Sequence, residues 1–220
     1  MSDVTPEYDQ QSSDYDGFIT KLVPDYALFQ EMLPSTLGSP ERVLDIGCGT
    51  GNTALALLRV FPHLQLTCLD PSPKMLQAAR AKLPEDVKFI EGGVEDVQGD
   101  EIFDAATSIM VMHNLPSDEA RETAYGLINT RLAENGVYAS VDIVEGECTR
   151  TRELFMAQWR SFMLQGLPAS EVDGKWLPLH RRKDRPVTLS RQLELLKHAG
   201  FRDVDVVYKR FNFALTVAFK

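Results

Sequence analysis

The stretch that decides the fold is Val43-Leu44-Asp45-Ile46-Gly47-Cys48-Gly49-Thr50-Gly51-Asn52. Its apolar start predicts a buried strand, and three glycines alternate directly after that strand. Glycine opens backbone conformations that other residues disfavour and lets a ligand approach the main chain closely. A second apolar run ends at Asp70, whose carboxylate can accept hydrogen bonds from ribose hydroxyls. Together the two segments predict a βα unit that binds a nucleoside cofactor.

Two residues distinguish between the nucleoside cofactors. The dinucleotide fingerprint G-x-G-x-x-G, counted from Gly47, needs its third glycine at a position where this chain has Asn52. A dinucleotide also brings an anionic pyrophosphate to the helix N-terminus, where Asp45 would repel it. S-adenosylmethionine has no phosphate and carries a cationic sulfonium and ammonium. We therefore expect S-adenosylmethionine, with a tight turn in an unliganded α/β protein as the alternative.

Composition and charge restrict the class of protein. The chain has 220 residues, 44% hydrophobic and 25% charged, enough for one well-buried α/β domain. Its net charge of -9 disfavours nucleic acid and anionic membranes as partners and favours small neutral or cationic substrates. The three cysteines cannot all pair and show no metal-ligand spacing, so we expect reduced thiols and no metal. Without a signal peptide or a membrane-length apolar run, the expected location is cytoplasmic.

Alternating hydrophobic periods predict a wound parallel sheet. Residues 1–13 are polar and acidic and predict a mobile tail, and residues 14–38 predict two short helices. Strands are expected at 42–46, 64–69, 87–91, 103–109 and 137–144. Helices are expected between them at about 51–60, 72–82 and 117–133. This alternation is typical of a sheet built from βα repeats.

Residues 147–186 break the alternation. Trp159 lies in a run with helical spacing, and Trp176 lies in a loosely ordered stretch that leads to the basic run 180–183. We expect a helical lid whose two tryptophans contact substrate, with ordinary amphipathic packing as the alternative. The basic run is either a contact for an anionic substrate group or, more commonly, a solvated face.

The chain ends with a tight hairpin. A helix is expected at 188–199, followed by strands at 203–210 and 214–219, which must be antiparallel because their connection is so short. We therefore expect one α/β domain over residues 1–220. Its Rossmann-like sheet would have seven strands, five parallel plus a C-terminal antiparallel hairpin, with the ligand at the switch point beside the first strand.

Three segments resemble the class I S-adenosylmethionine-dependent methyltransferases: residues 44–51, 69–76 and 198–201. Residues 23–26 and 211–213 are similar to the branch that contains carboxy-S-adenosylmethionine synthase and related small-molecule methyltransferases. The resemblance covers nearly the whole chain. It implies the seven-stranded fold of that class and methyl transfer to a small-molecule acceptor.

The resemblance also implies a set of cofactor contacts. Tyr26 would close over the methionine end, and Asp70 would bind the ribose diol. Tyr15 either stacks on the cofactor or packs the first helix down. The family has an acid at Gly93 that binds the adenine amino group, a contact left here to Glu95 or a water. The expected cofactor residues are Tyr15, Tyr26, Asp45, Gly47, Cys48, Gly49, Asp70, Pro71, Met75, Gly93, Val94, Ile109 and Met110.

The chemistry requires alignment more than acid–base catalysis. The protein mainly has to hold nucleophile, methyl and sulfur in line while excluding water, and a base matters only for a hydroxyl or ammonium acceptor. His113 follows the fourth strand and is the candidate base, with packing or capping of a helix start as the alternative.

Alternatives to methyl transfer use the same cofactor. Carboxylation of the cofactor needs an arginine from the lid, and a gap-free match places Leu177 there, with Arg181 and Arg182 nearby. We rank methyl transfer first, then carboxylation or intramolecular cyclisation or cleavage of the cofactor, then a non-catalytic cofactor-binding role. A homodimer is left open as the assembly.

Overall fold

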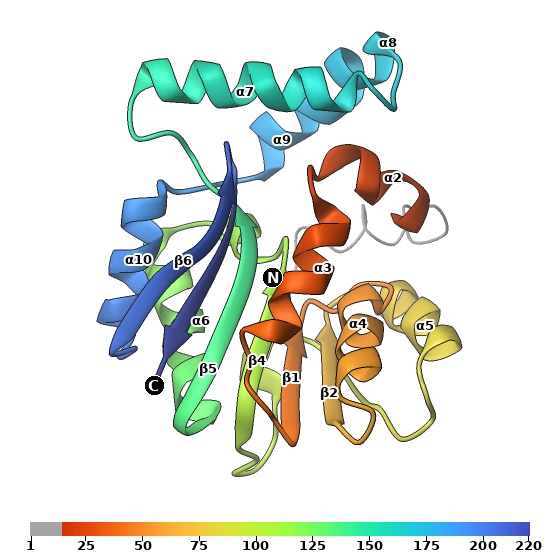
Figure 1. The fold of residues 1–220 in the computed structure, drawn as a ribbon, viewed down its shortest axis with the longest axis vertical. Helices are drawn as coiled ribbons and strands as arrows, with labels where there is room; N and C mark the ends of the chain where they lie inside the picture. The colour runs from red at the N-terminus through yellow and green to blue at the C-terminus, as the bar shows by residue number, and fades with distance from the viewer. Residues whose placement is uncertain (1–14) are drawn as a thin grey trace.

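The computed structural model describes residues 15–220, and the predicted mobile tail lies outside this range. At its centre is a seven-stranded sheet in the order β3-β2-β1-β4-β5-β7-β6 (Figure 1). The strands are β1 (Arg42–Ile46), β2 (Gln65–Asp70), β3 (Lys88–Glu91), β4 (Phe103–Ile109), β5 (Leu132–Ile143), β6 (Asp203–Arg210) and β7 (Phe213–Phe219). β1 to β5 pair in parallel, and β7 pairs antiparallel with β5 and β6. The predicted sheet is confirmed.

Helices cover both faces of this sheet (Figure 1). One face carries α3 (Tyr26–Ser35), α4 (Asn52–Val60) and α5 (Pro73–Lys82), and the other carries η1 (Val94–Asp96), α6 (Asp118–Arg131) and α10 (Leu189–His198). Successive strand residues point to opposite faces, so Val43 joins one hydrophobic core and Leu44 joins the other. No helix within residues 15–220 has the length and apolar composition needed to span a membrane.

Side-chain caps fix where several helices begin. The Ser72 hydroxyl accepts a hydrogen bond from the Met75 N–H, and Pro73 occupies the first helical position of α5. Ser117 caps α6 and Thr188 caps α10 in the same way. These local signals are visible in the sequence, which explains why the predicted starts of these helices agree within one residue.

The expected boundary between α6 and β5 was wrong. α6 ends at Arg131, and β5 begins at Leu132 instead of position 137. Asn135 adopts a left-handed conformation (φ 64) inside β5, and the register between β4 and β5 shifts in the same region. The predicted Asn135-Gly136 turn is therefore an irregularity within a longer strand.

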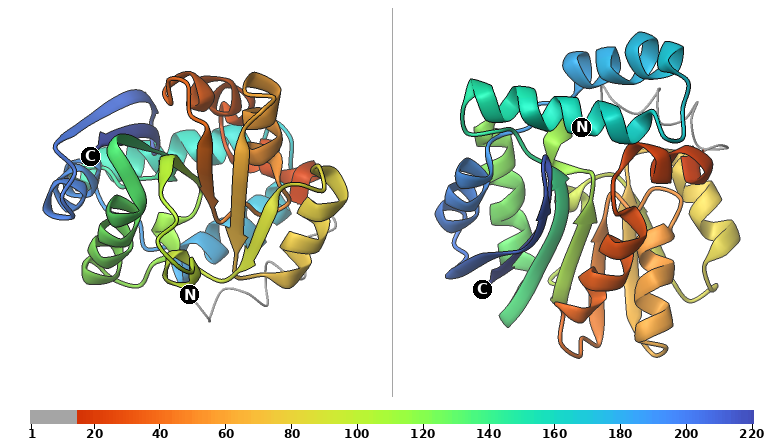
Figure 2. Two further views of the ribbon diagram at one scale, coloured as in Figure 1. Left: turned by 90° about the horizontal axis from the view of Figure 1, so that it is seen from below. Right: turned by 45° about the horizontal axis from the view of Figure 1, so that its top comes forward.

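Four helices lie over the carboxyl-terminal edge of the sheet (Figures 1 and 2). They are α2 (Tyr15–Leu22), α7 (Thr149–Met163), α8 (Ala169–Glu171) and α9 (Leu177–Lys183). The loosely ordered stretch expected around Trp176 is instead a π-helical turn, η3 (Val172–Trp176), that continues into α9. Val172, Trp176 and Leu177 are buried there, so tertiary packing stabilises a helix whose local propensity is weak.

Candidate functional site

The glycine loop after β1 has a backbone that only glycine accommodates. Gly47 has a left-handed φ of 63°, and a Cβ at this position would lie 2.5 Å from Cγ2 of Val111. Two residues later, the N–H of Gly49 donates to Oδ2 of Asp70 at 2.9 Å. The loop is therefore held against the end of β2 with its main chain open to a ligand.

Asp70 connects two loops of the site. Its Oδ1 accepts a hydrogen bond from the Ser72 N–H at 2.8 Å, and its Oδ2 accepts the bond from Gly49. The side chain is largely buried, and a carboxylate offers about four acceptor positions in all. Asp70 can thus organise the loops and still accept hydrogen bonds from ligand hydroxyls.

A cavity of about 100 Å³, here called the loop cavity, opens at this position. Eight of the expected cofactor residues line it: Tyr15, Gly47, Gly49, Asp70, Pro71, Met75, Ile109 and Met110. Within residues 15–220, no lysine, arginine or histidine lines this cavity. The lining therefore offers an apolar surface for a base and a carboxylate for a ribose, and it lacks the cations that would favour a phosphate.

Tyr26 and Cys48 do not line the loop cavity. The side chains of Asn52 and Gln30 contact the hydroxyl of Tyr26, whose pKa is raised mainly by burial. Cys48 turns its thiol into the core beside Cys68, and the neighbouring thiol and burial raise its pKa. Both residues therefore pack against the glycine loop on the side away from the loop cavity.

Gly93 and Val94 also lie outside the lining of this cavity. The N–H of Gly93 donates to Oδ2 of Asp96 at 2.9 Å, and the carboxylate of Glu95 fills the space that a Cβ at position 93 would take. A side chain at position 93 would require the Glu95 carboxylate to move aside.

Asp45, the buried acid of β1, is another expected cofactor residue that does not line the loop cavity. Its Oδ1 accepts a hydrogen bond from the Thr107 hydroxyl at 2.8 Å, whereas Oδ2 has no hydrogen-bond partner among the described residues. Burial raises the Asp45 pKa to about 7, the Thr107 bond opposes this, and the nearby charge of Asp70 adds to it. An ionised, half-satisfied carboxylate is costly to bury, and a cation relieves that cost whereas a phosphate increases it. The residues at this end of the sheet therefore fit S-adenosylmethionine.

A second cavity of about 110 Å³, here called the lid cavity, lies under the helices above the sheet. It shares Tyr15, Met110 and Asn114 with the loop cavity. Met110 is a non-glycine residue with a left-handed φ of 60°, a conformation that stores strain at the junction of the two cavities. The predicted substrate residues Trp159 and Trp176 both line the lid cavity.

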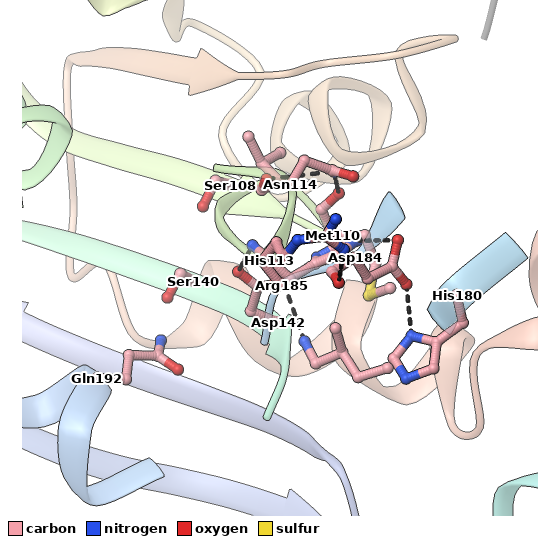
Figure 3. A network of polar contacts seen from close by, with 12 residues as sticks. Ser108, Met110, His113, Asn114, Ser140, Asp142, His180, Asp184, Arg185 and Gln192 are labelled. Carbon is pink, nitrogen blue, oxygen red and sulfur yellow. Dashed lines mark hydrogen bonds and ion pairs between the residues drawn. The ribbon is translucent and has the colours of Figure 1, made fainter. Parts of the chain in front are cut away.

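The predicted catalytic residue His113 lines the lid cavity. It belongs to a network of polar contacts with Asp142 and Asp184 (Figure 3). It lies in η2 (Met112–Asn114), where its N–H donates to Oδ2 of Asp142 at 2.9 Å and its Nδ1 bonds to Oδ1 of the same carboxylate. Its Nε2 lies 3.9 Å from Oδ1 of Asp184. Burial lowers the His113 pKa, but the charges of Asp142 and Asp184 outweigh it, and the net shift is upward. The geometry favours an imidazolium.

The C-terminal end of the lid is fixed to η2. Asp184 accepts a hydrogen bond from Nδ1 of His180 at 2.6 Å through Oδ2, and the N–H of Arg185 donates to the His113 carbonyl at 2.7 Å (Figure 3). Arg121 donates to the Arg185 carbonyl from the far side. These bonds bring His180 and Asp184 next to His113.

Three residues of the lid-cavity lining come from the end of the lid: His180 and Lys183, which the sequence offered only as part of the basic run 180–183, and Asp184, which sequence reasoning missed. The five lining residues of this segment are spaced three or four positions apart, which places them on one side of a helix: Trp176, Leu179, His180, Lys183 and Asp184. That spacing was visible, but it carried no meaning while the segment was expected to be loosely ordered.

The arginine needed for the carboxylation chemistry is not brought to either cavity. Leu177 is buried in the core, and Arg181 and Arg182 are exposed. Among the residues that the structure describes, no arginine lines the loop cavity or the lid cavity.

Comparisons with known proteins place the chain in a family. A family model described as a methyltransferase domain matches residues 43–136. Carboxy-S-adenosyl-L-methionine synthase of Methylococcus capsulatus is 30% identical over 219 residues, covering 94% of this chain and 89% of that protein. The synthase of Staphylococcus epidermidis is 28% identical, covering 96% and 95%.

A solved structure supports the fold. Human N-acetylserotonin methyltransferase in complex with S-adenosylmethionine superposes with a TM-score of 0.67 at 17% identity. The match covers 98% of this chain but only 56% of the human chain. The chain is therefore an enzyme of the class I S-adenosylmethionine-dependent methyltransferase family, related to the carboxy-S-adenosyl-L-methionine synthases, and S-adenosylmethionine is its cofactor.

Proposed function

We propose that this enzyme transfers a methyl group to a small molecule bound in the lid cavity. The observation that supports this most directly is that the loop and lid cavities share Tyr15, Met110 and Asn114. A donor in the loop cavity and an acceptor in the lid cavity are then neighbours. Alignment of this kind contributes roughly 7–11 kcal/mol to lowering a barrier.

Each end of the cofactor has candidate residues. Asp70 would accept the ribose hydroxyls, Pro71 and Met75 would contact the adenine, and Asp45 would balance the cationic end. S-adenosylmethionine supplies an electrophilic methyl group whose transfer breaks a carbon–sulfur bond and leaves a neutral thioether. The aromatic lid, with Trp159 held by a 2.6 Å hydrogen bond from its Nε1 to the Leu22 carbonyl, would exclude water from this reaction.

His113 is the residue we propose at the reactive group of the acceptor. Because Asp142 engages Nδ1 and raises the pKa, the imidazole would present a proton at Nε2. This differs from the role of general base expected from the sequence, since an imidazolium orients an acceptor oxygen and stabilises negative charge on it.

Calorimetry and mass spectrometry test the proposal together. The purified enzyme is expected to bind S-adenosylmethionine and to convert at least one member of a pooled set of small metabolites into a product heavier by one methylene unit. A chain that binds no S-adenosylmethionine, or binds it without methylating any acceptor in the pool, would contradict methyl transfer.

Carboxy-S-adenosylmethionine synthesis is the second candidate. The near full-length similarity to synthases of that name favours it. Leu177 stands where the resemblance implies an arginine, and no arginine lines either described cavity, which disfavours it, although His113 and Lys183 bring positive charge to the lid cavity. Mass spectrometry of ligand released from the purified protein separates the two, because a carboxylated nucleoside would establish this second reaction.

A further inference from the structure

In the lid cavity, a hydrogen-bond donor of His113 faces a hydrogen-bond acceptor of Asp184, and the space between them is here called the slot. Nε2 of His113 and Oδ1 of Asp184 are 3.9 Å apart, and no group within residues 15–220 forms a hydrogen bond with either atom. Two ordinary hydrogen bonds of about 2.7–2.9 Å that meet at one oxygen can span this separation. A hydroxyl has what the slot requires, since it accepts from Nε2–H and donates to the carboxylate.

The charges around the slot select against an ionised ligand. An ammonium group has only donors, so a cationic amine offers no acceptor to Nε2–H of His113. The carboxylate of Asp184 would repel an anionic acid at the slot itself. A neutral group that loses its proton during the reaction suits this combination best.

The rest of the cavity selects a flat ring. The rings of Phe18 and Trp176 pack with centroids 5.0 Å apart, and Trp159 meets His180 edge-on at 4.9 Å. Aromatic walls favour another ring through offset or edge-to-face packing. A volume of about 110 Å³ is of the same order as the ~150 Å³ apolar cavity known to bind benzene. The space suits one ring.

We propose, on the basis of the methyl-transfer function, that the acceptor is a phenol-class compound whose hydroxyl binds between His113 and Asp184. As the oxygen becomes the nucleophile, the O–H bond breaks, its electron pair stays on oxygen, and the proton passes to Oδ1 of Asp184. The imidazolium of His113 stabilises the phenolate. His180 is a positioning residue, because its bond to Oδ2 leaves Oδ1 of Asp184 directed at the slot.

Tryptophan fluorescence reads this cavity directly, because the chain has two tryptophans and both line it. The enzyme is saturated with S-adenosylhomocysteine and titrated with phenol, toluene, benzoate, benzylamine and cyclohexanol. Phenol is expected to change the emission saturably and to bind about tenfold or more tightly than each of the others. Hydrogen bonds to its hydroxyl separate it from toluene, benzoate and benzylamine, and a flat ring that is also a stronger donor separates it from cyclohexanol. Equal or tighter binding of toluene, benzoate, benzylamine or cyclohexanol would overturn the proposal.

Variants locate the effect at the slot. D184N is expected to weaken phenol binding about tenfold, since a charge-assisted hydrogen bond becomes a neutral one, and to leave toluene binding unchanged. D173N is the matched control, because Asp173 is an exposed lid carboxylate bonded to Arg160 and does not line the cavity. Phenol binding that D184N leaves intact contradicts the assignment. If circular dichroism shows that D184N does not fold, the order of probe affinities on the unmodified enzyme tests the proposal alone.

The same samples separate this inference from the methyl-transfer function. Calorimetry with S-adenosylhomocysteine reports the loop cavity independently of the phenol titration. Intact cofactor binding and turnover without phenol preference refute the acceptor class alone, whereas phenol preference without cofactor binding refutes methyl transfer alone.

Discussion

The loop cavity and the lid cavity adjoin each other but arise from the sequence in different ways. The loop cavity is built mainly by three connections that follow β1, β2 and β4, each within a few residues of its strand. The lid cavity joins α2, η2, α7 and α9, which are far apart along the chain. Local backbone geometry determines the first, so a motif reveals it, whereas tertiary packing determines the second.

D70A should give the largest difference between the two cavities in how much ligand affinity each one loses. This change removes an acceptor from the N–H groups of Gly49 and Ser72, and it removes the proposed ribose contact. Hydrogen bonds to a charged group contribute about 1.5–3 kcal/mol each, so we expect S-adenosylmethionine affinity to fall about 100-fold or more by calorimetry. Phenol binding in the lid cavity should change far less.

Asp104 provides a matched control at the opposite edge of the sheet. Its Oδ2 accepts hydrogen bonds from the N–H groups of Glu41 and Arg42 at 2.9 and 2.8 Å, much as Asp70 serves its own loops. D104A should lower the unfolding temperature and leave cofactor affinity intact. A comparable loss of cofactor affinity in D104A would mean that D70A reports stability and not the site.

Asp45 should make cofactor binding depend on pH. Its raised pKa means that the folded protein holds this proton more tightly than the unfolded chain, so its contribution to stability falls as pH rises from about 4 to about 7. A cationic ligand prefers the ionised carboxylate. Affinity for S-adenosylmethionine should therefore increase about tenfold between about pH 6 and about pH 8, with proton release on binding.

D45N tests the source of that dependence. An amide does not titrate, so calorimetry on D45N at both pH values should give nearly equal affinities. The free energy of unfolding of ligand-free D45N should also no longer fall between about pH 4 and about pH 7. A pH dependence that survives in D45N would assign it to the cofactor's own groups, and Asp45 would then not be the counter-charge.

The same contrast explains which parts of the fold and the site could be predicted from the sequence. The strands show apolar runs or apolar–polar alternation, and Asp70 with the glycines has a characteristic spacing, so the sheet and most of the loop-cavity lining could be predicted. Asp184 has no such signal, because its role depends on η3 and α9 packing Val172, Trp176 and Leu177 against the core. The distance from Asp184 to His113 depends on contacts between segments about 70 residues apart, and one sequence does not encode it in any local pattern.

Asp16 links α2, which contributes to both cavities, to the glycine loop, and its replacement should give the smallest change in ligand affinity. Its carboxylate accepts hydrogen bonds from Thr50 at 2.6 Å and Asn52 at 2.8 Å and pairs with Lys82, which fastens α2 to the glycine loop. Tyr15, the adjacent residue, lines both cavities. Because the side chain is half exposed, we expect D16N to weaken S-adenosylhomocysteine and phenol binding only about twofold each.

The position of this contact makes even a small effect informative. K88Q, which breaks the exposed 2.8 Å pair with Glu101 away from either cavity, should change neither affinity. Added salt should reduce the difference between the unmodified enzyme and D16N, since it screens exposed pairs. If D16N weakened only one ligand, α2 would serve a single cavity, and the lid would close over donor and acceptor in separate steps.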